Sequence, residues 1–291
     1  MKKEKSKVNI QHLKNHLQLL TGLRPHRNVE NPISLTTAER YIQQEFENND
    51  ASTELQTWEV YNEEYHNVIV RYNPKGKKKL IVGAHYDVCG DQPGADDNGS
   101  GVAGLLELAR MIFANAPKLN YCIEFVAYNL EEPPYFLTPH MGSCIHAQSL
   151  IENNDDVIGM ICLDMIGYFS DEPGSQRFPD PFLEDVFTST GDFIMVVGVD
   201  NQSAFSDKVY KLMKRDTKIK VHKMDLPLWS PLNGLSDQMN YQALNIQAVL
   251  INDTAFYRNP HYHLESDTME TLDFEKMSEV VNSCYRAIVS F

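Results

Sequence analysis

The amino-acid sequence predicts a single α/β domain over residues 1–291. Short apolar runs typical of buried strands alternate with amphipathic helical patterns along the chain. No Pro-, Gly- or Ser-rich linker interrupts this alternation, and 291 residues are enough for one large domain with a substantial core. We therefore expect one sheet covered by helices.

The expected elements follow in chain order. Helical periodicity covers much of residues Val8 to Leu20, Thr36 to Phe46, Gly99 to Phe113, Ser143 to Glu152, Ala204 to Arg215 and Asp273 to Ser290. Apolar runs predict strands at Glu54 to Tyr61, Tyr65 to Tyr72, Leu80 to Ala84, Tyr121 to Tyr128, Val157 to Leu163, Phe193 to Val199 and Asn245 to Ile251.

The run KKKLIVGAHYDV predicts a buried strand that delivers His85 at its C-terminal end. Asp87 lies two residues further on, and side chains two apart on an extended chain share a face. Its carboxylate could therefore accept the second imidazole N–H of His85 and fix the tautomer, as a supporting residue behind a metal ligand. The alternative is that both are ordinary polar residues at a strand end.

The run PGADDNGSGVAGLLELARMI predicts a Gly-rich loop that enters an amphipathic helix, with Asp97 just before the helix. A carboxylate is favoured at a helix N-terminus even without a metal, so N-capping by Asp96, Asp97 or Asn98 is the alternative to a ligand role. The loop lacks the GK[ST] ending and the GxGxxG spacing of phosphate-binding loops.

The run YCIEFVAYNLEEPPYF predicts a strand that ends at two adjacent acids, Glu131 and Glu132. Adjacent side chains diverge, so Glu132 can bind a metal while Glu131 stays free as a general base that passes a proton to the leaving nitrogen. A solvated acidic turn is the alternative explanation of this pair.

Two further ligands are expected nearer the C-terminus. Asp164 lies in the apolar run DVIGMICLDMIGY, where an unpaired charge would be costly, so it needs a metal or a salt-bridge partner. His263 is the ligand that we choose from the later polar loop. Asp267 and Glu270 resemble a capping arrangement for the last helix.

The five candidate ligands together favour zinc. Two imidazoles and three carboxylates suit zinc better than magnesium or calcium. If Asp97 bridges two zinc ions, each ion keeps positions open for water, and a water between them should ionise to hydroxide near neutral pH. The candidate ligands are His85, Asp97, Glu132, Asp164 and His263.

Composition excludes some classes of partner. The chain has 26 basic and 40 acidic residues, a net charge of −14, so its field repels nucleic acid and anionic membranes.

No segment has the length of a signal-peptide core or a membrane span, and we expect a cytoplasmic protein. Its five cysteines are odd in number and lack CxxC spacing, which indicates neither a disulfide framework nor a thiolate zinc site.

Taken in order, HYD, GADDNGSG, EE after a strand, LDMIGY and YHLESDT resemble the co-catalytic dizinc aminopeptidases, a family that includes carboxypeptidase-type and glutaminyl cyclase relatives. The resemblance runs from about His85 to the C-terminus. It implies a zinc-peptidase domain with a three-layer αβα fold around a mixed, mostly parallel twisted sheet.

The resemblance also implies roles for the site residues. His85 and Asp164 would hold one zinc, Glu132 and His263 the other, Asp97 would bridge them, and Glu131 would be the general base. Tyr262 precedes the last ligand and would stabilise the oxyanion, unless it is only a packed aromatic.

The chain departs from the family's pattern at several positions. The run PPYFLTPHMGS is longer than usual, and Tyr135 and Phe136 in it are hypothesised to shape a substrate pocket. Ser236 to Gln238 read SDQ where relatives frequently have SDH. Asn98 follows Asp97 where the family often has a cis Asp-Asp peptide, so a cis bond is left open. The segment LPLWSPLNG could line the pocket, form an interface or pack in the core.

The expected function is a metal-dependent aminopeptidase that uses a metal-bridging hydroxide and Glu131 to release the N-terminal residue of peptides with a free N-terminus. One alternative is a glutaminyl cyclase-like acyltransferase with one zinc, although such relatives tend to carry Trp where this chain has Tyr262. The other is a noncatalytic, metal-stabilised binding protein, which would have no need of the free Glu131. The oligomeric state is not indicated.

Overall fold

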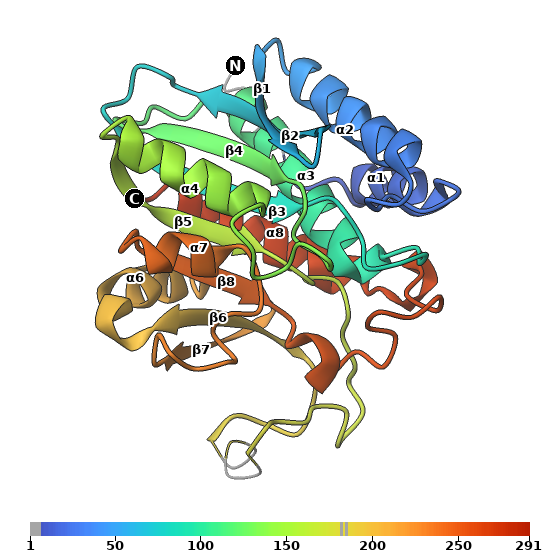
Figure 1. Ribbon diagram of the computed structural model, residues 1–291. Coiled ribbons are helices and arrows are strands. Elements are labelled where there is room, and N and C mark those ends of the chain that lie inside the picture. Colours follow the sequence, from blue (N-terminus) through green and yellow to red (C-terminus); the bar gives the residue numbers. More distant parts are fainter. Residues whose placement is uncertain (1–6, 181–182, 184–185) are drawn as a thin grey trace, which may run out of the picture.

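The computed structural model describes residues 7–180, 183 and 186–291. Its strands form one eight-stranded sheet in the order β1-β2-β4-β3-β5-β8-β6-β7 (Figure 1). Four neighbouring pairs are parallel and three are antiparallel, so the sheet is mixed and mostly parallel, as predicted. The strands are β1 Thr53–Val60, β2 Glu63–Tyr72, β3 Lys78–His85, β4 Cys122–Tyr128, β5 Asp156–Leu163, β6 Phe193–Val199, β7 Lys220–Leu226 and β8 Ala248–Asn252.

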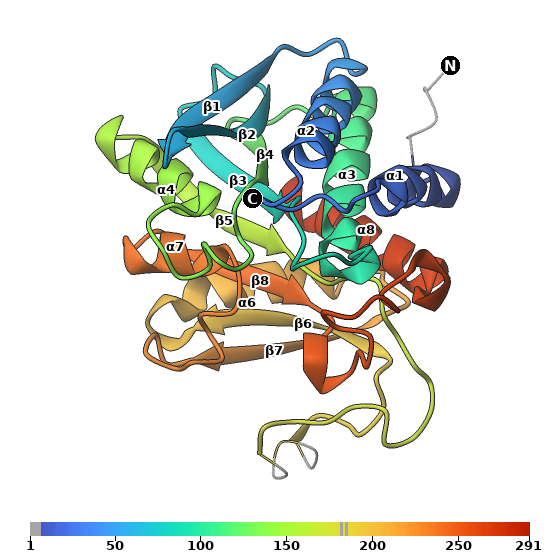
Figure 2. The same ribbon diagram turned by 45° about the vertical axis from the view of Figure 1, so that its right-hand side comes forward.

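Helices cover both faces of this sheet (Figures 1 and 2). The larger apolar core joins one face to α1, α2, α3, α6 and α8, and the smaller core joins the other face to α4 and α7. The predicted three-layer αβα architecture is therefore confirmed. The helices are α1 Ile10–Gly22, α2 Pro32–Glu47, α3 Gly101–Asn115, α4 Gly142–Glu152, α6 Ser203–Met213, α7 Gln238–Ala243 and α8 Phe274–Ile288.

The central strands read as apolar runs because both of their faces are covered. Along β3, Leu80, Val82 and Ala84 belong to the larger core, whereas Ile81 belongs to the smaller one. All seven residues of β4 are buried. This two-sided burial explains why the sequence located these strands well.

The differences from the expected elements lie at the periphery. β7 was not predicted, because KVHKMDL is an edge strand with charged and polar side chains and mostly intermediate burial. The short α7 was also missed. α2 starts at Pro32 rather than Thr36, with proline in the first turn, where its missing N–H costs nothing.

The described helices include none that is long and apolar enough to cross a membrane.

The C-terminal ends of β3, β4, β5 and β8 converge on one edge of the sheet. β3 ends at His85, Glu131 follows β4, and Asp164 follows β5 directly. Asp97 lies in an irregular helical segment, Ala95–Ser100, just before α3, and His263 lies in the loop after β8. The fold therefore collects residues from distant parts of the sequence at a single site.

Candidate metal centre and active site

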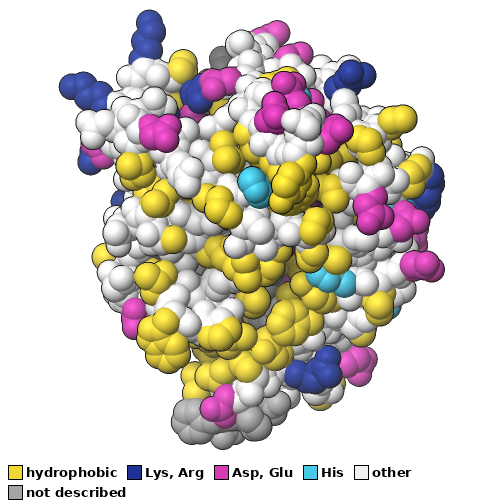
Figure 3. Space-filling model, in the orientation of Figure 1, with side chains coloured by type: hydrophobic (Ala, Val, Ile, Leu, Met, Phe, Trp, Pro, Cys, Tyr) yellow, Lys and Arg dark blue, Asp and Glu magenta, His cyan; other side chains and the backbone are white. Residues whose placement is uncertain are grey.

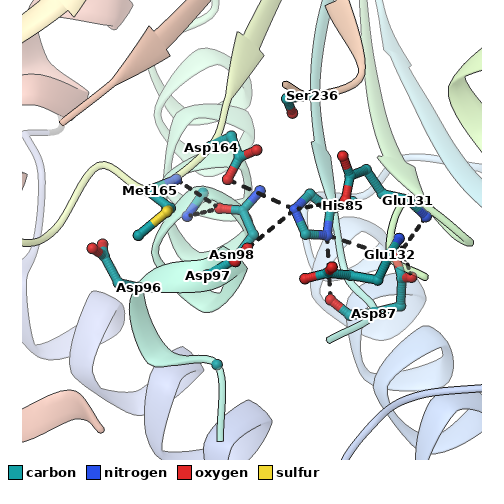
Figure 4. A network of polar contacts seen from close by, with 12 residues as sticks. His85, Asp87, Asp96, Asp97, Asn98, Glu131, Glu132, Asp164, Met165 and Ser236 are labelled. Atoms are coloured by element: carbon teal, nitrogen blue, oxygen red, sulfur yellow. Dashed lines mark hydrogen bonds and ion pairs between the residues drawn. The ribbon is translucent and has the colours of Figure 1, made fainter. Parts of the chain in front are cut away.

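The two carboxylate oxygens of Asp97 face two different histidines. Asp97 Oδ1 lies 3.5 Å from His85 Nε2, which is 3.7 Å from Asp164 Oδ1. Asp97 Oδ2 lies 3.0 Å from His263 Nε2, which is 3.5 Å from Glu132 Oε1. The structure thus brings all five predicted ligands together, and it divides them into two His–carboxylate pairs on either side of Asp97. Figure 4 shows the part of this cluster around His85, with Asp97 and Asp164.

Three buried atoms in this cluster have no hydrogen-bond partner among the described residues: His85 Nε2, Glu132 Oε1 and Asp164 Oδ1. Buried polar atoms without a partner are costly and rare. All three belong to predicted ligands. Divalent cations would satisfy these lone pairs, so the residues fit a zinc site of nitrogen and oxygen donors.

Glu132 and His263 bind protons more tightly than usual. Burial raises the pKa of Glu132 to about 7, and the nearby Asp97 adds to this effect. Burial lowers the pKa of His263, but its contacts with the carboxylates of Asp97 and Glu132 outweigh burial and raise the pKa to about 10. Divalent cations would compete with these protons for the same lone pairs, so metal binding should release protons.

Glu131 is buried beside the cluster, and its Oε2 lies 3.8 Å from His85 Nε2. Burial raises the pKa of Glu131 well above its usual range, although the charge of His85 opposes this shift. A carboxyl group with a raised pKa is suited to take up a proton and return it. The geometry therefore places the predicted general base next to the predicted ligands.

Asp87 supports the site through the main chain of the two adjacent acids. Its carboxylate accepts the N–H of Glu131 at 3.2 Å and the N–H of Glu132 at 3.0 Å. The imidazole Nδ1–H of His85 donates instead to the main-chain oxygen of Asp87, at 3.2 Å. The predicted contact between that imidazole N–H and the carboxylate is longer, at 3.7 Å, so the carboxylate acts mainly on Glu131 and Glu132.

Asp267 fixes the loop that carries Asp97. Its carboxylate accepts the N–H groups of Asp96 at 2.9 Å and Asp97 at 3.1 Å. The expectation that Asp267 helps to cap the last helix is wrong, because Asp273 is the N-cap of α8 and accepts the N–H of Lys276. The sequence assigned Asp267 a structural role at the last helix, whereas in the structure its carboxylate binds the main chain of the loop that carries Asp97.

Asn98 ties the same loop to the end of β5. Its Nδ2 donates to the carbonyl of Leu163 at 2.9 Å, and its Oδ1 accepts the N–H of Met165 at 3.2 Å. These two residues flank Asp164. The peptide bond between Asp97 and Asn98 is cis, which settles the point that the sequence left open.

Arg27 is a supporting residue that the sequence did not reveal. It is fully buried, and its guanidinium donates to the carbonyl oxygens of Leu20, Tyr86, Pro93 and Gly94. Burial lowers its pKa to about 10, so it stays charged at neutral pH. Arg27 therefore fixes both ends of the loop that connects His85 to the Asp97 segment.

A cavity of about 320 Å³ opens onto the cluster and is walled mainly by apolar side chains. Figure 3 shows the corresponding hollow in a face rich in hydrophobic side chains. Phe136 and Leu232, both hypothesised pocket residues, line it. Tyr135 instead packs against Tyr65 and His140, and Trp229 is 82% exposed. Further apolar lining residues are Phe178, Met195, Val197, Met224, Leu226, Leu235, Leu250 and Phe256.

Tyr262 also lines this cavity. Its ring stacks on that of His263, with centroids 3.8 Å apart and an angle of 17° between the planes. Burial raises the pKa of the Tyr262 hydroxyl far above its usual range, and the nearby carboxylates add to the shift. The hydroxyl therefore keeps its proton at neutral pH and can donate a hydrogen bond.

Gln238 is the last residue of the SDQ run, where the resemblance led us to expect histidine. It is buried in the first turn of α7, and its side chain donates to the carbonyl of Asn233 at 2.7 Å. This contact holds the adjacent chain segment and makes no link to the five predicted ligands.

An αβα sheet with a two-sided His–carboxylate cluster and a free glutamate at its C-terminal edge defines a metal-dependent hydrolase. The sequence model of peptidase family M28 matches residues 67–288. The chain belongs to this family of zinc hydrolases.

Two curated proteins are similar to the chain in sequence. It is 38% identical over 278 residues to a protein of Escherichia coli K12 described as "Uncharacterized protein YfbL", covering 93% of this chain and 84% of that one. Leucine aminopeptidase 1 of Trichophyton equinum is 26% identical over 227 residues, which cover 74% of this chain. The match spans only 54% of the fungal protein's length.

Solved structures share the fold. The Legionella pneumophila LapA aminopeptidase matches with a TM-score of 0.77 and 22% identity, over 97% of this chain and 72% of that one. A Bacteroides thetaiotaomicron glutaminyl cyclase, bound to N-acetylhistamine, matches with a TM-score of 0.73 and 18% identity, over 98% and 99% of the two chains.

Proposed function

We propose that the protein is a zinc aminopeptidase that hydrolyses the N-terminal peptide bond of peptides with a free N-terminus. The observation that carries the proposal is the division of the cluster by Asp97, with the uncoordinated Glu131 beside it. His85 with Asp164, and His263 with Glu132, would each hold one zinc, with Asp97 shared. Zinc there would supply an activated water molecule and would polarise the scissile carbonyl.

The remaining chemistry falls to residues of this chain. Glu131 takes the proton of the attacking water and returns it to the leaving nitrogen, a role that suits its raised pKa. The hydroxyl of Tyr262 donates to the carbonyl oxygen as negative charge develops on it. Stacking on His263 holds the ring in place, so this donor is already oriented before the substrate binds.

The apolar cavity supports a preference for substrates whose N-terminal side chain is large and apolar. Its walls are mainly Phe, Met, Leu and Val side chains next to the cluster, and they offer few partners to a charged group. Burying a large apolar side chain there contributes about 1.5–3 kcal/mol, whereas an unpaired charge would be penalised. We therefore propose that N-terminal Leu, Met and Phe are preferred over Lys, Glu and Asp.

The test is hydrolysis of aminoacyl chromogenic amides by the zinc-loaded protein, with N-acetylated amides as matched controls. We expect turnover of free-amine substrates only, fastest with large apolar residues. Glu131→Gln should lower kcat by about 10²–10⁴-fold. Equal turnover of the acetylated amides contradicts the aminopeptidase proposal, and retained activity in Glu131→Gln contradicts the role of the base.

Tyr262→Phe tests the oxyanion role separately. It removes only the hydroxyl and keeps the ring that stacks on His263. We expect kcat to fall by about 10²–10³-fold with KM nearly unchanged. An unchanged kcat would leave Tyr262 as a packed aromatic.

Glutaminyl cyclase activity is the second candidate, because a solved glutaminyl cyclase shares the fold over 99% of its own chain with a TM-score of 0.73. The same protein should be incubated with peptides that begin with glutamine. Ammonia release without peptide-bond hydrolysis would replace the aminopeptidase proposal, and no reaction in either assay would favour a binding protein.

A further inference from the structure

Cys89 lies beside one of the two proposed metal positions. Its sulfur is within 4.8 Å of a carboxylate oxygen of Glu132 and an imidazole nitrogen of His263. Glu132 is buried, and its Oε1 has no hydrogen-bond partner among the described residues. We propose that Cys89 is a further protein ligand of the metal held by Glu132 and His263. This inference rests on the metal-binding part of the proposed function.

The loop that carries Cys89 is fixed on both sides of the cysteine by the segment from His26 to Asn28. The main-chain position of Cys89 is therefore set by the fold before any metal binds, which reduces the entropy cost of ligation. Three hydrogen bonds do this: Val88 N–H to the Arg27 carbonyl at 3.0 Å, the Asn28 side chain to the Gly90 carbonyl, and His26 N–H to the Asp91 carboxylate at 3.1 Å.

A fourth donor changes the character of this position. With Cys89, Glu132, His263 and Asp97 the metal has four protein ligands, which completes the tetrahedral set that zinc prefers. On binding, the thiol loses its proton to solvent and the sulfur bonds as thiolate. The position of His85 and Asp164 keeps three protein donors with Asp97, and hence room for water or substrate.

The two positions should therefore differ in the metals that they select. Thiolate ligands favour zinc, cadmium and cobalt over manganese and magnesium. The Cys89 position is the tightly held, zinc-selective one, and the His85 position is the more open and more exchangeable one. The sequence did not indicate a thiolate ligand, because Cys89 comes close to Glu132 and His263 only in the folded chain.

Cobalt(II) tests the proposal without reference to activity, because a sulfur–cobalt bond produces an intense charge-transfer band in the near ultraviolet. The full chain would be loaded with cobalt and compared with Cys89→Ser and the matched control Cys144→Ser. Cys144 is also half-buried, but it lies on α4 and belongs to none of the potential ligand clusters of the described residues.

We expect the band in the wild type and in Cys144→Ser, and its loss in Cys89→Ser. The affinity of Cys89→Ser for one equivalent of zinc should fall at least about 10-fold, since even residues behind the ligands contribute that much. A cobalt-loaded wild type without the band overturns the proposal, whether or not the variant folds. A band that persists in Cys89→Ser does the same.

The outcomes separate this proposal from the proposed function. Cobalt binding without a sulfur band removes Cys89 as a ligand and leaves the aminopeptidase assay unaffected. Failure of the wild type to bind cobalt overturns both the Cys89 ligand and the metal centre on which the enzymatic proposal depends.

Discussion

Replacing Arg27 by methionine should destabilise the protein strongly, although Arg27 is no metal ligand. Methionine keeps much of the aliphatic length but removes the guanidinium. That group donates four hydrogen bonds of 2.6 to 3.2 Å to the carbonyls of Leu20, Tyr86, Pro93 and Gly94. The arginine is fully buried, so these oxygens lose their donor where water has little access.

The expected magnitude follows from these contacts. A hydrogen bond to a charged group contributes about 1.5–3 kcal/mol, but removing the buried charge also relieves its desolvation. The net loss in the free energy of unfolding should be about 3–5 kcal/mol. For a chain of this size the melting temperature should then fall by roughly 5–15 °C.

The assay is thermal unfolding followed by circular dichroism, with and without zinc. Arg40→Met is the matched control, because Arg40 is exposed on α2 and its loss should change stability by no more than about 0.5 kcal/mol. Arg27→Lys keeps the charge but lacks the forked donors of the guanidinium. Its melting temperature should therefore lie between those of Arg27→Met and Arg40→Met. A melting temperature of Arg27→Met equal to that of Arg40→Met would refute the reasoning.

Three more predictions address the position of the site acids, the pH dependence of the protein's stability and the apolar cavity. Asp87→Asn replaces one acceptor of the Glu131 and Glu132 N–H groups by a donor, so zinc affinity in a chelator competition should fall about 10–100-fold; unchanged affinity would deny Asp87 its positioning role. Burial lowers the pKa of His16 from 6.5 to about 4, so the unfolded chain binds a proton at this histidine more readily than the folded chain. The contribution of neutral His16 to the free energy of unfolding is therefore complete above pH 6.5 and is lost as pH falls towards 4. His16→Gln should remove up to about 3 kcal/mol of that pH dependence in urea unfolding of the metal-free protein, and an equally steep profile would contradict the assignment. Val197→Phe narrows the cavity and should lower kcat/KM for leucyl relative to alanyl amides by about 10–200-fold, whereas an equal change for both would place the leucyl side chain elsewhere.

Four of the five proposed metal ligands could be suggested from the sequence because each of the four follows a local pattern. His85 and Asp164 end apolar runs that form central strands, and a buried strand delivers the next polar residue to the edge of the sheet. Glu132 follows a strand that Pro133 and Pro134 end, and Asp97 precedes a periodic helix. Such signals lie within about ten residues of the ligand, so they can be read without knowledge of the fold.

Two supporting residues, Asp267 and Arg27, could not be predicted in this way, because their partners are distant in the sequence. Asp267 accepts the N–H of Asp96, a residue 171 positions earlier, and Arg27 donates to Tyr86, 59 positions later. A local pattern for Asp267 existed, but it indicated helix capping, a role that Asp273 performs. Periodicity reports which face of an element is buried, and it does not report which distant loop a buried polar group will meet.

The segment before residue 67 is therefore part of the site, although the family model begins only at that residue. Arg27 closes the loop after β3, and its carbonyl accepts the N–H of Val88 just before Cys89. Its neighbours His26 and Asn28 hold the same loop just after Cys89. Asp267 approaches the Asp97 segment from the other end of the chain. A loop fixed from both sides holds its ligands at preset positions, so metal binding need not pay to order them. The predicted ligands thus lie in recognisable sequence motifs, whereas Arg27, which fixes the loop after His85, lies in a segment that carries none.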